Sequence, residues 1–412
     1  MKMLVSILLA ACVSTAAHAA PVSVLFVGNS YTFGRNDPVM SYNAANVSDL
    51  TQAMFLANPA GSNLFEPHPW GGVPGIFKQF TVQAGLDYDV ALSTRNAASL
   101  RGHLLNSNPA GWDLRGNIAS AAWDQVVLQE QSDEPLPRQP GLASNPEYFK
   151  AYANKIEQFI HSGAADAFRE RDLIGGTTAA CQALTGASAG TCNLLRTVPA
   201  NPNARPSTEV FLYQTWARPN LVNAPFTTVT DPVTGAVSFT TTPAASFYPS
   251  LEAMTADLHD AYFGLAATNP GFAGVAPVGD SFMSAVRSGV ATRNMYAAGA
   301  LSDGLVDLWW DDGTHASTAG SYLSALTLFG TLTGLDPAQL GANEIAARDL
   351  GIDSDAAVAL QRVASLQLGF AAPIPEPSTW ALLTLGLGLL AGQARRQRQG
   401  TRSKGRPRPD VR

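Results

Sequence analysis

Short apolar runs that recur along the chain limit the folds available to it more than any other feature. Each run holds five or six mainly apolar residues, as strands do when both faces of a sheet are covered. Longer segments with helical patterning separate most of the runs, and this alternation predicts a doubly wound, parallel α/β sheet. The predicted strands are Val22 to Val27, Tyr88 to Ser93, Gln125 to Gln129, Val210 to Gln214 and Gly274 to Val278, and the predicted helices include Ile76 to Ala84, Tyr148 to His161, Ser250 to Ala267 and Ser317 to Leu332.

Three long stretches interrupt this pattern. They are Met40 to Trp70, Gly175 to Thr208 and Asn223 to Ala245. Long irregular insertions in a compact fold tend to be functional or mobile. We interpret them as loops or small hairpins on one domain of residues 20 to 335, and residues 336 to 372 as a closing helical segment and a linker.

Residues 1 to 19 have the pattern of a signal peptide. Lys2 precedes an apolar run from Leu4 to Val13, and small residues follow as far as Ala19. We expect cleavage after Ala19, because cleavage one residue later would leave Pro21 at the new N-terminus. An uncleaved anchor is the alternative, but this run is about half of the roughly 20 apolar residues that a spanning helix needs.

A second targeting signal is predicted near the other terminus. Pro375-Glu376-Pro377 precedes an apolar stretch from Trp380 to Gly392 and then a series of arginines from Arg395 to Arg412. This order resembles the PEP-CTERM sorting signal. The resemblance implies transient membrane association through this segment and removal by an exosortase-type processing enzyme. A plain tail anchor is the alternative, although the apolar stretch is short for a stable span.

The net charge and the cysteines indicate which class of partner and which redox compartment suit the chain. The formal net charge is −6, and it is more negative without the two terminal segments, which argues against nucleic acid as a partner. Cys12 leaves with the signal peptide. Cys181 and Cys192 are then expected to form a disulfide in an oxidising compartment, with two unpaired thiols as the alternative.

A serine follows the first predicted strand, where the chain gives way to a loop or helix. In open parallel sheets, ligands bind outside the carboxyl ends of the strands, so Ser30 is expected at the reactive edge. A serine at this position is equally suited to cap a helix. Taken alone, the segment from Gly28 to Thr32 leaves both interpretations open.

A possible partner for that serine lies far downstream, directly before an apolar helical run. A histidine needs an orienting carboxylate on one ring nitrogen before the other nitrogen can take a proton from a serine. Asp312 and His315 are three residues apart on one predicted loop and can form that pair. Asp-Gly is also an ordinary turn signal, so this motif alone is weak.

Taken together, the two segments resemble the first and last sequence blocks of the SGNH, or GDSL-type, hydrolases over residues 22 to 334. Trp123-Asp124 and Thr215-Trp216 resemble an uncharacterised branch of that superfamily. Phe26 to Thr32 is similar to the first block, with Asn29 where many members have aspartate, and Asp312 to His315 is similar to the last. The resemblance implies a flavodoxin-like three-layer α/β/α sandwich. It also implies that Ser30 is the nucleophile, His315 its general base and Asp312 the orienting carboxylate. Asp311 is the rival for the last role but departs from the three-residue offset.

The resemblance further implies an oxyanion hole, although the middle blocks depart from the family's pattern. The family places a glycine after the second strand, whereas Thr94 to Leu100 contains none. We expect the backbone amides of Ser30 and Ala97 to donate, and which residue replaces the glycine stays open. Gln131 stands where the family has an asparagine, and its carboxamide keeps an N–H donor one methylene farther out.

No metal ion or other cofactor is predicted, because the histidines lack metal-ligand spacing with one another or with cysteine. His68, in a segment rich in proline and glycine, is interpreted as part of a surface turn, with lining of the cleft as the alternative. Arg95 and Arg101 are interpreted as solvated side chains, with binding of an anionic substrate as the alternative.

These features predict an exported serine esterase in the periplasm or at the cell surface or matrix of a Gram-negative bacterium. PEP-CTERM proteins are associated with bacteria that make exopolysaccharide. The favoured substrate is therefore an O-acyl or O-acetyl group on a surface or exopolysaccharide glycan, with a small ester as the general class. The alternatives are an acyltransferase and a non-catalytic glycan-binding or matrix protein on the same fold, which would have no need for Ser30 and His315.

Overall fold

The computed structural model describes most of the chain between residues 20 and 370. The described ranges are 20–57, 68–106, 112–222, 226–230, 237–241, 246–297 and 299–370. The predicted signal peptide and the predicted sorting segment, with its apolar stretch from Trp380 to Gly392, lie outside these ranges. No helix within them is long and apolar enough to cross a membrane.

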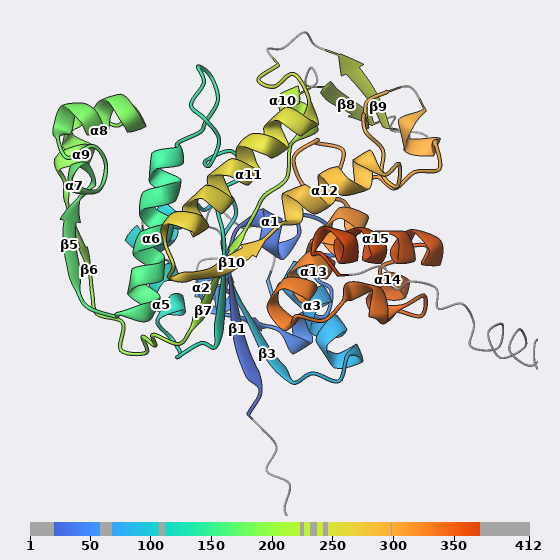
Figure 1. Ribbon diagram of the computed structural model, residues 1–412, viewed down its shortest axis with the longest axis horizontal. Helices are drawn as coiled ribbons and strands as arrows, with labels where there is room; N and C mark the ends of the chain where they lie inside the picture. The colour runs from blue at the N-terminus through green and yellow to red at the C-terminus, as the bar shows by residue number, and fades with distance from the viewer. Residues whose placement is uncertain are drawn as a thin grey trace, which may run out of the picture. The chain divides into compact units, whose positions relative to one another are not determined.

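A six-stranded parallel sheet forms the centre of the fold (Figure 1). Neighbouring strands are parallel throughout, in the order β10-β7-β4-β1-β3-β2. Later strands lie on both sides of β1, with β3 and β2 on one side and β4, β7 and β10 on the other. The strand order therefore reverses at β1. The strands are β1 (Val22–Gly28), β2 (Ser48–Asp49), β3 (Tyr88–Thr94), β4 (Gln125–Gln129), β7 (Glu209–Tyr213) and β10 (Phe272–Ala276).

The central strands are apolar because the sheet has no solvent-exposed face near its middle. Val24 to Val27 in β1 have no exposed surface, and Val126 to Leu128 in β4 are equally buried. Burial of one such side chain contributes about 1.5–3 kcal/mol to stability. This burial on both faces explains the uninterrupted apolar runs of the sequence.

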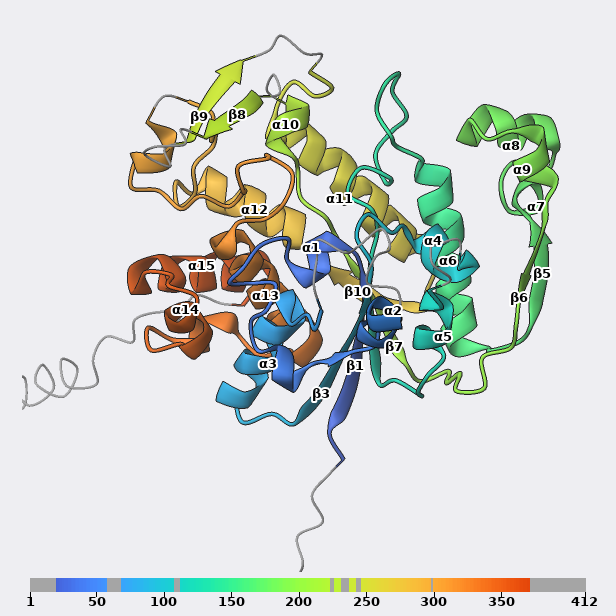
Figure 2. The same cartoon turned by 180° about the vertical axis from the view of Figure 1, so that it is seen from behind.

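Helices cover both faces of the sheet (Figures 1 and 2), which confirms the predicted three-layer α/β class. On one face α13 packs against α3 and α15. On the other face α4 packs against α6, and α11 continues this layer, with the rings of Phe149 and Tyr262 4.7 Å apart. The helices of the two layers are α3 (Gly72–Gln83), α4 (Leu100–Leu105), α5 (Leu114–Ile118), α6 (Pro146–His161), α11 (Leu251–Thr268), α12 (Val278–Arg287), α13 (Thr318–Thr333), α14 (Ile345–Asp349) and α15 (Ser354–Gln367).

The long insertions contain small elements of their own. The first holds α2 (Gln52–Ala57) and the edge strand β2. The second belongs to an arm in which β5 (Asp166–Arg169) pairs with β6 (Leu195–Val198) and carries three short helices (Figures 1 and 2). They are α7 (Glu170–Leu173), α8 (Thr178–Thr185) and α9 (Ala189–Asn193). The third contains the hairpin of β8 (Phe226–Thr230) and β9 (Val237–Thr241).

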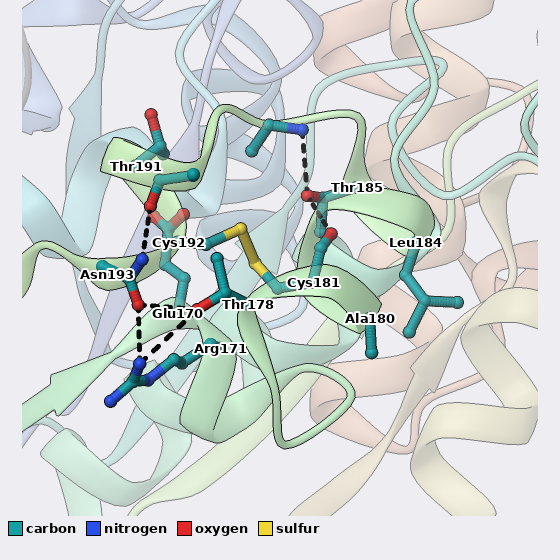
Figure 3. Close-up of a disulfide and its surroundings, with 12 residues drawn as sticks. Glu170, Arg171, Thr178, Ala180, Cys181, Leu184, Thr185, Thr191, Cys192 and Asn193 are labelled. Carbon is teal, nitrogen blue, oxygen red and sulfur yellow. Dashed lines mark hydrogen bonds between the residues drawn. A yellow bond between two sulfur atoms is a disulfide. The ribbon is translucent and has the colours of Figure 1, made fainter.

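A disulfide between Cys181 and Cys192 joins two helices of the arm, α8 and α9 (Figure 3). Next to it, Asn193 accepts hydrogen bonds from Arg171 at 2.7 Å and from Thr178 at 2.8 Å. The two cysteines are eleven positions apart, so the disulfide closes a loop within the arm and does not tie the arm to the sheet.

The described chain up to Leu368 forms one compact unit, and Gly369–Arg412 is a second unit. Within the first, α14 and α15 make up the predicted closing helical segment. Their inner sides join the large hydrophobic core that surrounds the sheet.

A buried histidine of α4 supports the end of β1. His103 has no exposed surface, and its Nε2 donates to the carbonyl of Gly28 over 2.9 Å. A carbonyl only accepts, so Nε2 carries the hydrogen of the neutral ring and Nδ1 is the bare nitrogen. Burial lowers the pKa of His103 to about 4; the hydrogen bond to Gly28 opposes this shift, and the charge of Arg95 adds to it.

We predict that His103 makes the protein less stable as the pH falls from about 6.5 to about 4. In this window the unfolded chain takes up a proton at His103 while the folded protein does not, so acid favours the unfolded state. His103→Gln keeps a donor toward Gly28 but cannot titrate. Denaturant unfolding at several pH values should show a smaller loss of stability in the variant than in the wild type across this window, and equal losses would contradict the prediction.

Candidate active site

Ser30 lies directly after β1, at the edge of the sheet where the parallel strands end. It is 5% exposed and opens the single-turn helix α1 (Ser30–Phe33). The cap of this helix is Asn29, whose Oδ1 accepts the backbone N–H of Tyr31 at 3.0 Å. The hydroxyl of Ser30 is therefore free of the capping role that the sequence left open, and it stands at the strand where the order reverses, the usual place of ligand sites in such sheets.

A buried glutamine of β4 fixes the turn that carries Ser30. Gln129 is fully buried, and its Oε1 accepts the N–H of Asn29 and the hydroxyl of Thr32, each at 2.9 Å. Gly28 leaves room for this side chain: a Cβ at Gly28 would lie 2.4 Å from Thr32 Oγ1 and 2.5 Å from Gln129 Oε1. The turn thus depends on a close contact between β1 and β4.

His315 connects Ser30 to Asp312. The hydroxyl of Ser30 lies 2.9 Å from Nε2 of His315, and Nδ1 of His315 lies 2.6 Å from Oδ2 of Asp312. A carboxylate only accepts, so Nδ1 carries the hydrogen and Nε2 offers its lone pair to the serine hydroxyl. The structure thus brings together Ser30, Asp312 and His315, and the contact with the ring is made by Asp312 and not by Asp311.

The other oxygen of Asp312 holds the loop in shape. Oδ1 accepts the N–H groups of Thr314 at 2.8 Å and of His315 at 2.9 Å. Burial favours the neutral carboxylic acid, but the side-chain and backbone N–H groups of His315, with the N–H of Thr314, outweigh it and lower the pKa of Asp312. Asp312 is therefore ionised near neutral pH and can stabilise an imidazolium at His315.

Two stacked aromatic rings hold the same loop through hydrogen bonds to its backbone. Tyr31 and Trp216 are nearly parallel, with ring centroids 4.0 Å apart. The hydroxyl of Tyr31 and Nε1 of Trp216 both donate to the carbonyl of Thr314, at 2.7 and 3.0 Å. Tyr31 also meets the ring of His315 edge-on at 5.6 Å. Sequence reasoning assigned neither Tyr31 nor Trp216 a role in positioning this loop.

The two further residues expected in an oxyanion hole flank this centre. Ala97 lies on the loop after β3 with φ of +55°, a left-handed conformation that glycine adopts without cost. Ala97 therefore has a backbone shape that glycine favours, in the segment where the resemblance led us to expect a glycine. The side-chain oxygen of Gln131 accepts the N–H groups of Asp133 and Glu134 at 3.1 and 3.2 Å. In the described part of the chain, neither Ala97 nor Gln131 makes a hydrogen bond to Ser30 or His315.

The interpretation of His68 as part of a surface turn is wrong. Its side chain is fully buried, with Nδ1 2.5 Å from Oδ2 of Asp49 and the ring stacked 3.5 Å from that of Trp70. Asp49 also accepts the N–H of Trp70. One carboxylate at the end of β2 therefore binds both His68 and Trp70 and holds the His68 side chain in the interior. Local composition did not reveal this, because the partner lies nineteen residues earlier.

Arg101 is likewise not a simple solvated side chain. Its guanidinium lies 2.6 Å from Oε1 of the buried Glu170 and 4.9 Å from the ring of Tyr148. This contact ties α4 to the arm. Across the described residues, no group of three or more His, Cys, Asp or Glu side chains is arranged to hold a metal ion.

Residues 373–398 match the family model described as the PEP-CTERM protein-sorting motif. The chain carries a PEP-CTERM sorting signal. Signals of this kind direct export in Gram-negative bacteria, so the protein is exported. The matched residues lie outside the described ranges.

Several solved structures are similar to this one at low identity. A protein from Slackia heliotrinireducens, described as a candidate SGNH hydrolase, is 18% identical with a TM-score of 0.35, over 76% of this chain and 100% of its own. A DUF4886 family protein from Bacteroides uniformis is 15% identical with a TM-score of 0.40, over 85% and 95%. A candidate GDSL-like lipase from Parabacteroides merdae is 13% identical with a TM-score of 0.32, over 76% and 95%. No curated protein sequence matches the chain.

We predict that Gly28→Ala lowers the free energy of unfolding by about 1–3 kcal/mol, because the added methyl group collides with Gln129 and Thr32. Gly264 in α11 is a matched control, since a Cβ there meets nothing within 4 Å. Gly264→Ala should gain up to about 1 kcal/mol from helix propensity. Denaturant unfolding of both variants measures the contrast, and equal stability of the two would show that Gln129 does not confine the turn.

Proposed function

We propose that this protein is an exported serine hydrolase that cleaves ester bonds through an acyl-enzyme on Ser30. The observation that supports this best is the unbroken chain of contacts from Ser30 through His315 to Asp312. A hydroxyl on a base that is itself oriented by a carboxylate is the arrangement that activates a serine, whatever the fold. A glycan-binding protein would need no such contacts.

In the proposed reaction, Oγ of Ser30 attacks the acyl carbon while Nε2 of His315 takes the hydroxyl proton. The ionised carboxylate of Asp312 stabilises the imidazolium that forms. The imidazolium then gives its proton to the departing alcohol, which leaves the acyl group on Ser30. A water molecule, deprotonated by the same nitrogen, then attacks the acyl carbon. The bond between the acyl carbon and Oγ breaks, the imidazolium returns its proton to Oγ, and the carboxylic acid leaves.

The negative oxygen of the tetrahedral intermediate needs donors that are in place beforehand. We assign this role to the backbone amides of Ser30 and Ala97 and to the carboxamide of Gln131. The Gln131 side chain suits the role because its oxygen is engaged by two backbone N–H groups, while its amino group donates one hydrogen to Ser132 Oγ at 3.5 Å and keeps a second for the oxyanion. The positive φ of Ala97 supports the same assignment on the opposite loop.

The proposed substrate is an O-acyl or O-acetyl group on a surface or exopolysaccharide glycan. Its support is the export of the protein, because surface and matrix glycans lie outside the cytoplasm. In this proposal a signal peptidase removes residues 1 to 19. An exosortase-type enzyme removes the C-terminal segment after transient membrane association and frees the body.

We predict that Ser30→Ala and His315→Ala each remove nearly all turnover of a short-chain aryl ester, and that the double variant is little worse than either. Residues that act as a unit are strongly non-additive, because the loss of one disables the other. Initial rates of the three purified variants test this. A serine-directed phosphonate should label the wild type and fail to label Ser30→Ala, and full activity in either single variant would refute the assignment.

We predict opposite outcomes for the two neighbouring aspartates. Asp312→Asn removes the charge that stabilises the imidazolium and favours the wrong tautomer, and it should lower turnover by roughly ten-thousandfold, the size seen in other triads. Asp311→Asn is the control and should change turnover by less than about tenfold. Initial rates on the same aryl ester near neutral pH compare them, and a reversal would assign the orienting role to Asp311.

A further inference from the structure

One arginine contacts both of the loops that the proposed chemistry brings together. Arg218 follows β7 and is nearly buried, with 14% of its side chain exposed. Its Nη1 donates to Oγ of Ser132 at 2.9 Å, and its Nη2 donates to Oγ1 of Thr314 at 3.3 Å. Ser132 is next to Gln131, and Thr314 is next to His315. A single guanidinium therefore spans the loop after β4 and the loop that holds the histidine.

The remaining contacts of Arg218 fix its orientation. Nε donates to Oδ1 of Asn220 at 3.2 Å. The carboxylate of Asp133, itself 8% exposed, lies 3.6 Å from Nη1 and balances the positive charge. The side chain is thus held at its stem by Asn220, and its two terminal nitrogens are directed to different loops.

We infer that Arg218 is a positioning residue that sets the distance between the oxyanion donor on Gln131 and the base His315. This inference rests on the proposed function, because it gives Arg218 a role in the same reaction. Catalytic groups must be held within about 0.5 Å of their productive positions by residues that are themselves locked. The planar guanidinium with its fixed fork of donors meets this need, whereas a lysine ammonium provides one flexible point charge.

A substrate-free experiment tests the coupling itself. Four amides report on the two loops, because Asp133 and Glu134 donate to Gln131, and Thr314 and His315 donate to Asp312. In Arg218→Ala, amide hydrogen exchange of the full chain should become about tenfold faster at all four, since local opening sets these rates. Faster exchange in only one loop, or in neither, would overturn the inference.

Arg205→Ala is the matched control for this experiment. Arg205 also ties its own segment to another, through Trp123 O at 2.6 Å and Asp124 Oδ1 at 2.7 Å, but these adjacent residues precede β4, at the opposite ends of the strands from Ser30. Its loss should speed exchange near Asp124 and leave the four reporter amides unchanged. Equal acceleration of those amides in both variants would mean general loosening and would also overturn the inference.

Kinetics test the consequence for turnover. Arg218→Ala should lower kcat on the aryl ester by about 10–100-fold, with KM changed by less than about threefold, because the group acts through its neighbours and not on the substrate. Low-millimolar guanidinium chloride should restore at least part of the loss, while equal sodium chloride should not. Arg218→Lys should stay well below the wild type, and Arg205→Ala should keep wild-type rates and show no response to guanidinium.

The two proposals fail in different ways. Wild-type turnover in Ser30→Ala would refute the proposed hydrolase, while the exchange data would still decide whether Arg218 couples the loops. Wild-type kcat in Arg218→Ala or Arg218→Lys, beside an inactive Ser30→Ala, would overturn the role of Arg218 alone. A fall in kcat without guanidinium rescue, accompanied by a matching loss of folded protein on melting, would also overturn it.

Discussion

The parallel pairing of β1 with β3 and β4 is the constraint on which the rest of the molecule depends. In this register Gly28 lies opposite Thr94, and Val27 lies opposite Leu128. The three strands therefore end at the same level, and the loops that follow them meet at one edge of the sheet. The hydrogen bonds from Asn29 and Thr32 to Gln129 convert that alignment into a fixed turn for Ser30.

Much of this architecture follows from the sequence because its causes are local. All five predicted strands form, since burial on both faces requires continuous apolar runs. Asp312 and His315 lie three residues apart, so their contact is visible as a spacing. The strand β10 begins two residues before its predicted start, at an irregularity between Phe272 and Gly274. The strand β2 was missed because two residues carry no recognisable pattern.

The parts that could not be predicted depend on contacts between distant segments. Arg218 and Thr314 are 96 positions apart, and Asn29 and Gln129 are 100 positions apart. Neither pair has a local signature, since an arginine after a strand or a glutamine at its end is unremarkable in isolation. The burial of His68 was missed for the same reason. It depends on the contact with Asp49 and on stacking against aromatic rings, and the amino-acid composition of the segment does not show where these groups lie. The proposal of Ser30 as the nucleophile came only from the resemblance of its segment to a known sequence block.

The contact between Ser30 and His315 spans 285 positions of the chain. A ribosome makes the serine long before it makes the histidine, and a serine without a base is a poor nucleophile. The hydroxyl of Ser30 is therefore not activated in a nascent polypeptide that does not yet contain His315. On the proposed function, reactivity toward esters arises only when nearly the whole body has been made and folded, so an incomplete or unfolded chain cannot attack esters.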